Sequence, residues 1–164
     1  MEESATTRKF TLIKVGKVVT LVGSIVSIAV AVLAYVQPGR SVEGTWTLKT
    51  QTENIREARF RDMELRYRVN LTVDGTHVTG NGYKLGEKLA GGKYRPDEGK
   101  TRPPFDIAGN LDLNSDSLEV WFTEEQGGEQ STTDLKLEKN VGSWAGTFKS
   151  DRATSSGKAS LSRF

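Results

Sequence analysis

The sequence contains no cysteine and a single histidine, His77, among its 164 residues. The lack of cysteine excludes disulfide frameworks, thiol nucleophiles and cysteine-based metal sites, and one histidine cannot build a site on two imidazoles. An excess of one charge is also missing, because 23 Lys and Arg face 21 Asp and Glu. A chain so close to neutral gives no indication of binding DNA or RNA. We therefore expect no metal, no cofactor and neither DNA nor RNA as a partner.

Enzymatic motifs are missing as well. The sequence holds no Gly-x-Ser-x-Gly nucleophile elbow, no glycine-rich phosphate loop followed by lysine, and no metal-ligand spacing. His77 follows the Gly75 turn at a position that alternation directs outward, which is typical of a surface histidine. We predict a protein with no catalytic residue and no enzymatic activity. A domain that uses His77 as a catalytic base is the alternative.

One long hydrophobic run stands out against this polar background. Residues 18–37 contain no charge, and twenty helical residues span ~30 Å, about the thickness of a bilayer hydrocarbon core. Pro38 and Gly39 are typical of a helix end. The sequence predicts a tail over residues 1–9, a single transmembrane helix over 10–37 and a linker over 38–41. A buried globular helix and a cleaved signal peptide are the alternatives.

Small residues recur at four-residue spacing along the predicted membrane helix. One such line is Gly23, Ser27 and Ala31. Small side chains let helix backbones approach closely within lipid, so this face predicts self-association in the membrane. The flanking charges favour a cytoplasmic N-terminus only slightly, with four basic residues before the uncharged run over 18–37 and three within twenty residues after it.

Residues 42–164 change to the two-residue alternation of half-buried strands. In residues 63–73 the odd positions are apolar and the even positions are polar, and the hairpin signal Asp74-Gly75 follows. The expected strands cover residues 42–50, 63–73, 76–85, 105–113, 118–122, 133–137, 141–149 and 157–164. Eight consecutive strands without long crossovers favour an all-β, eight-stranded up-and-down barrel over a two-layer sandwich.

Basic residues gather in the longest interruption between the expected strands. Residues 84–104 hold six Lys and Arg against three acids, together with Tyr94 and a Pro-Pro pair. Long loops in compact domains are often functional, and Arg, Lys and Tyr together suit a phosphate-bearing ligand with a base to stack on. The candidate ligand-binding residues of this lid are Tyr83, Tyr94, Arg95, Lys100 and Arg102. A solvated charged loop is the alternative.

The first expected strand carries Gly44-Thr45-Trp46, and Gly142-Ser-Trp144 repeats the pattern on the seventh. A Gly-x-Trp on the opening strand of an antiparallel meander resembles the lipocalin and avidin-type superfamily. In those barrels the tryptophan closes one end by packing across it. The resemblance implies that Trp46 and Trp144 close the barrel ends.

A membrane segment joined directly to a small Gly-x-Trp barrel resembles the transmembrane β-barrel effectors of cyclic-oligonucleotide anti-phage signalling (CBASS). The matching segments are Val42-Glu-Gly-Thr-Trp46, the repeat near Trp144 and residues 155–161. The resemblance implies a cyclic-nucleotide receptor that assembles on binding its ligand and disrupts the inner membrane. It also implies a partner nucleotide cyclase. Two membrane passes are usual in that family, whereas residues 10–37 supply one, so a cytosolic barrel requires an external N-terminus.

The leading hypothesis is a non-enzymatic receptor-effector in the bacterial inner membrane, with a cytosolic barrel that binds a cyclic di- or oligonucleotide. Membrane lipid and further copies of the chain are the other expected partners. The rival hypothesis is an exported, membrane-anchored lipocalin-like binding module or envelope scaffold. The nucleotide, the orientation, the oligomer number, the trigger and the openness of the barrel interior are left open by the sequence.

Overall fold

The computed structural model describes residues 42–97, 103–126 and 128–164. The predicted membrane helix over 10–37, its association face of Gly23, Ser27 and Ala31, the tail and the linker lie outside the described residues, as do Lys100 and Arg102. Within the described part of the chain, no helix has both the length and the apolar character needed to cross a membrane.

Nine strands and two short 3-10 turns make up the described chain. The strands are β1 (Gly44–Asn54), β2 (Glu64–Asp74), β3 (His77–Lys88), β4 (Arg95–Pro96), β5 (Phe105–Asp112), β6 (Ser117–Gln126), β7 (Glu129–Asn140), β8 (Ser143–Ser150) and β9 (Ser155–Arg163). The 3-10 turns are η2 (Ala58–Phe60), between β1 and β2, and η3 (Arg152–Thr154), between β8 and β9.

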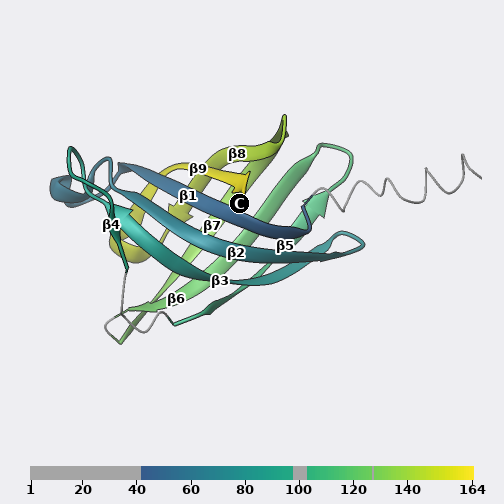
Figure 1. The fold of residues 1–164 in the computed structure, drawn as a ribbon, viewed down its shortest axis with the longest axis horizontal. Helices are drawn as coiled ribbons and strands as arrows, with labels where there is room; N and C mark the ends of the chain where they lie inside the picture. Colours follow the sequence, from purple (N-terminus) through teal and green to yellow (C-terminus); the bar gives the residue numbers. More distant parts are fainter. Residues whose placement is uncertain (1–41, 98–102, 127) are drawn as a thin grey trace, which may run out of the picture. The chain divides into compact units, whose positions relative to one another are not determined.

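Eight of the strands close into a barrel (Figure 1). Each pairs antiparallel with the next along the chain, with β3 passing directly to β5, and β9 returns to pair with β1. The two residues of β4 add to the edge of β3 through Gly86 and Glu87. The predicted eight-stranded up-and-down barrel is confirmed, and the sandwich is not formed.

Several strands run further than alternation indicated. β1 continues to Asn54, β6 reaches Gln126 and β7 begins at Glu129. In each extension the inward positions are polar, as with Thr52 on β1 and Ser131 on β7, so the apolar–polar pattern disappears although the strand does not. One predicted strand is shorter than expected: Leu113, the last residue of the strand predicted over 105–113, lies in the turn after β5 and is 42% exposed.

The interior is apolar at one end of the barrel, which we call the closed end. The inward side chains of this end are fully or almost fully buried: Val42, Trp46, Leu71, Val78, Leu111, Leu118, Leu137, Trp144 and Leu161. Trp46 donates its indole N–H to the carbonyl of Val42 at 2.7 Å. The Arg163 guanidinium lies 4.0 Å from the centre of the Trp46 ring and donates to the carbonyl of Glu43 at 2.8 Å. These contacts join the first and last strands across the closed end.

Candidate ligand cavity

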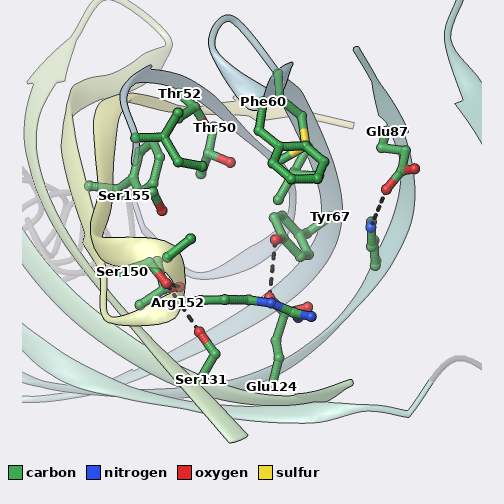
Figure 2. A pocket seen from close by; sticks show the side chains of 17 residues that line it. Thr50, Thr52, Phe60, Tyr67, Glu87, Glu124, Ser131, Ser150, Arg152 and Ser155 are labelled. Carbon is green, nitrogen blue, oxygen red and sulfur yellow. Dashed lines mark hydrogen bonds and ion pairs between the residues drawn. The ribbon is translucent and has the colours of Figure 1, made fainter. Parts of the chain in front are cut away.

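A cavity of about 320 Å³ occupies the other end of the barrel, which we call the mouth (Figure 2). It is bounded by residues of seven barrel strands, all except β5, by η3 and by the segment between β1 and β2. The lining residues are Thr50, Thr52, Ile55, Phe60, Met63, Leu65, Tyr67, Lys84, Glu87, Glu124, Ser131, Thr133, Phe148, Ser150, Arg152, Ala153 and Ser155. The size falls at the lower end of the range for small-molecule sites.

One side of the cavity is rich in hydroxyl groups, because inward positions that hold Leu or Trp nearer the closed end hold Thr or Ser here. On β7 and β8 these hydroxyls bond to one another: the Ser131 and Ser150 oxygens lie 3.1 Å apart, and Thr133 donates to Ser150 at 3.2 Å. On β1, Thr50 and Thr52 are each only 3% exposed, and among the described residues no hydrogen bond engages their hydroxyls. Their hydroxyls are therefore available to a ligand.

The side of the cavity formed by residues 55–65 is apolar. Ile55, Phe60, Met63 and Leu65 line it. Backbone hydrogen bonds from Thr52 N–H to Met63 C=O (2.9 Å) and from Asp62 N–H to Thr52 C=O (2.8 Å) fold this segment back onto β1. That fold places the Phe60 ring over the cavity (Figure 2).

A pair formed by a buried tyrosine and a partly buried glutamate lies at the inner side of the cavity. The Tyr67 hydroxyl donates to Glu124 Oε2 at 3.1 Å. Tyr67 is 3% exposed and packs edge-on against Phe105 and Phe122, with ring centres 5.6 Å away in both cases. Burial, and then the charge of Glu124, raise the pKa of Tyr67 well above its ordinary value, so the phenol keeps its proton and remains a donor.

Glu124 is the acidic group of the cavity that has no cation in direct contact. Burial raises the pKa of its carboxyl, while the Tyr67 hydrogen bond and the charges of Lys84 and Arg152 act in the opposite sense. Lys84 is held by Glu87 at 2.7 Å, and Arg152 extends from η3 toward Glu124 (Figure 2). The cavity thus combines two carboxylates, two cations, hydroxyls and an apolar wall, which suits a polar ligand that carries a ring.

The predicted ligand-binding residues within the described chain do not line this cavity. Tyr83 pairs with Arg68 across β2 and β3, and its hydroxyl accepts a 3.4 Å hydrogen bond from Arg68 Nη1. The ring of Tyr94 lies 4.7 Å from the Arg66 guanidinium. Arg95 is exposed on β4. The structure therefore brings the two tyrosines to the outer wall of β2 and β3, beside arginines of the second strand.

Sequence reasoning missed most of the cavity residues. Glu124 carried a signal, because it continues the inward series Leu118, Val120 and Phe122 by one more step of two. Arg152 carried none, since its place depends on the turn between β8 and β9. Trp46 and Trp144, predicted to close the barrel ends, are both 2% exposed and lie at the closed end. His77 is exposed at the start of β3, away from the cavity.

No protein-family model matches this chain, and no curated protein matches its sequence. Within the described residues, no three His, Asp or Glu side chains come together in a way that could hold a metal ion. The cavity and the groups that line it are therefore the basis for inferring a function.

Proposed function

We propose that this protein is a non-enzymatic receptor whose barrel binds a cyclic di- or oligonucleotide, with one base inside the cavity and the phosphates at the mouth. The observation that carries the proposal is the composition of the cavity: the cations Lys84 and Arg152 and the partner-free hydroxyls of Thr50 and Thr52 share one small space with the Phe60 ring. Phosphates are bound by such cations, and bases by aromatic faces.

The size of the cavity sets how much of the ligand enters it. About 320 Å³ accommodates one ring system and its nearest substituents, whereas two linked nucleosides need more room. The remainder of the ligand would extend past Lys84 toward the basic segment 84–104, of which Lys88, Lys93 and Arg95 are exposed. This arrangement keeps the predicted role of the basic segment but moves base recognition into the barrel.

The membrane part of the proposal rests on the sequence. The uncharged run over residues 18–37 supplies the single-pass anchor over 10–37, and Gly23, Ser27 and Ala31 supply its self-association face. Ligand binding would drive assembly of several chains in the bacterial inner membrane, with a cytosolic barrel and a nucleotide cyclase as functional partner, as the resemblance to the anti-phage effectors implies. Membrane disruption by the assembled helices would be the output.

Thermal unfolding of the full-length chain in mild detergent tests the ligand. Buried Trp46 and Trp144 provide the fluorescence signal. A cyclic nucleotide at a hundred times its dissociation constant stabilises the folded state by ~2.7 kcal/mol and raises the midpoint by roughly 5–10 °C. A Lys84→Ala variant should lose the shift, whereas Lys88→Ala, on the exposed end of β3, should retain most of it. No shift with any cyclic nucleotide at millimolar concentration would overturn the proposal.

An exported lipocalin-like module with an apolar ligand is the second candidate, and the apolar wall of Ile55, Phe60, Met63 and Leu65 favours it. The two candidates place the barrel on opposite sides of the membrane. Alkaline phosphatase fused after Phe164 is active only when exported, so it should be inactive under the receptor proposal and active under the alternative.

A further inference from the structure

We infer that Glu124 is the specificity-determining residue of the cavity, selecting a ligand ring that presents two adjacent N–H donors, which among the nucleobases is the edge of guanine. This inference rests on the proposed function and names the base that the cavity accepts. It follows from the free acceptor capacity of one partly buried carboxylate, from the way that carboxylate is held, and from the groups on the opposite side of the cavity.

The free capacity is visible in the hydrogen bonds of Glu124. A carboxylate offers about four acceptor positions, and only Oε2 is engaged, by the Tyr67 hydroxyl at 3.1 Å. Oε1 has no hydrogen-bond partner in the described chain, yet it is not sealed from the cavity. A carboxylate oxygen that loses its water on ligand binding without gaining a hydrogen bond costs free energy. A ligand that donates N–H groups to Oε1 therefore binds more tightly, and a ligand that presents acceptors to it binds more weakly.

Tyr67 holds this carboxylate in place. Its ring packs edge-on against the stacked rings of Phe105 and Phe122, and its hydroxyl occupies one oxygen of Glu124, which leaves the other oxygen without a partner in the described chain. Tyr67 is therefore a positioning residue for Glu124. Lys84 from β3 and Arg152 from η3 are the charged groups that act on the same carboxylate, and both favour its ionised, accepting form.

The other sides of the cavity suit the rest of a guanine ring. Guanine presents N1–H and the 2-amino group side by side, with a carbonyl next to them. Adenine and cytosine each offer one donor beside a ring acceptor, and uracil offers a single ring N–H between two carbonyls. Figure 2 shows Thr50 and Thr52 across the cavity from Glu124, where their hydroxyls can donate to ring acceptors, and Phe60 beside them as an apolar face.

The experiment compares three cyclic dinucleotides on the full-length chain by titration calorimetry: cyclic di-GMP, cyclic di-IMP, which lacks only the 2-amino groups, and cyclic di-AMP. The wild-type protein should bind cyclic di-GMP about tenfold or more tightly than either of the others, since a hydrogen bond to a charged group typically carries that much discrimination. In Glu124→Gln, an isosteric change, the preference for cyclic di-GMP should fall to within about threefold.

Glu125→Gln is the matched control, because Glu125 is the exposed neighbour that points out of the barrel. It should preserve all three affinities. Glu124→Asp keeps the charge on a side chain that is shorter by one methylene, and it should also lose the preference for cyclic di-GMP. An unfolding curve followed by tryptophan fluorescence verifies that each variant folds. If the wild-type binds a cyclic dinucleotide but Glu124→Gln keeps the wild-type ranking, this inference alone is overturned. If the wild-type binds none of the three, the proposed function is overturned and the inference with it.

Discussion

At the scale of single residues, two glutamates show how the surroundings decide the behaviour of one chemical group. Burial taken alone acts to raise the pKa of both carboxyls, Glu64 and Glu124. For Glu64 the hydrogen bonds from Lys49 (2.8 Å) and Arg66 (2.6 Å) outweigh that effect, and its pKa falls below the ordinary 4.5. For Glu124 burial prevails, because Lys84 and Arg152 act on it without direct contact. Glu64 therefore links β1 to β2 on the outer wall, whereas Glu124 keeps acceptor positions for a ligand.

Glu64→Gln should destabilise the barrel in a pH-dependent way. A carboxyl whose pKa is lower in the folded state contributes stability above its unfolded value near 4.5, and that contribution is lost as the pH falls through the folded pKa. We expect a loss of about 1–2 kcal/mol at pH 7 and a smaller loss at pH 3. Urea unfolding at both pH values measures it. Glu129→Gln, at an exposed position, is the control, and an equal loss at both pH values would contradict the ion-pair explanation.

At the scale of the strands, inward glycines let the sheet curve tightly. A Cβ added to Gly146 on β8 would lie 2.0 Å from the Lys136 carbonyl oxygen of β7, and one added to Gly109 on β5 would lie 2.2 Å from the Glu119 carbonyl oxygen of β6. Neighbouring strands approach so closely there that only glycine fits. Such positions are typical of small barrels, where strands must bend to close the sheet.

Gly146→Ala should therefore destabilise the protein, by roughly 1–3 kcal/mol, because the clashing atom is backbone and cannot turn aside. Ala145→Ser changes the exposed neighbour on the same strand and should cost less than about 0.5 kcal/mol. Urea unfolding followed by tryptophan fluorescence compares the two. Equal stability of Gly146→Ala and the wild type would show that β7 and β8 have room to separate.

The number and order of the strands could be predicted from the sequence because their central residues alternate and strong turn signals separate them. The prediction for β2 was within one residue of the observed Glu64–Asp74, since Asp74-Gly75 fixes its end. The last residues of β1 and β6 and the first residues of β7, which lie at the mouth, could not be predicted. Inward Thr52, Glu124 and Ser131 are polar there, so the same substitutions that create the cavity remove the pattern that indicates a strand.

At the scale of the whole molecule, closure of the barrel depends on residues far apart in the chain. β9 pairs with β1, and Arg163 covers the Trp46 ring while donating to the carbonyl of Glu43, 120 residues away. Contacts of such sequence separation form late and slowly in folding, because the long intervening chain must first be ordered.

Arg163→Ala should weaken this closure. Loss of the cation–π contact and of the charge-assisted hydrogen bond should lower the free energy of unfolding by about 1–3 kcal/mol. Arg163→Lys keeps the charge without the planar guanidinium and should recover only part of the loss. Stopped-flow unfolding measures both, and an unchanged unfolding rate in Arg163→Ala would show that the strand pairing alone holds the barrel closed.

A closed barrel could be foreseen because eight hairpin-linked strands without crossovers have few other ways to pair. The cavity could not be foreseen, since its volume depends on how side chains from seven strands and two connecting segments pack together. Tyr67 illustrates this: alternation predicts that it points inward, but its contact with Glu124 joins residues 57 positions apart.

Both ends of the described barrel meet at the closed end, where Trp46 pairs with Arg163, while the mouth lies at the far end of every strand. A reporter domain or a sensor surface attached before Val42 or after Phe164 is therefore joined to the protein on the side away from the cavity. Such attachments leave the entrance clear, so a fluorescent fusion or an immobilised form of this barrel should respond to its ligand in the same way as the free protein.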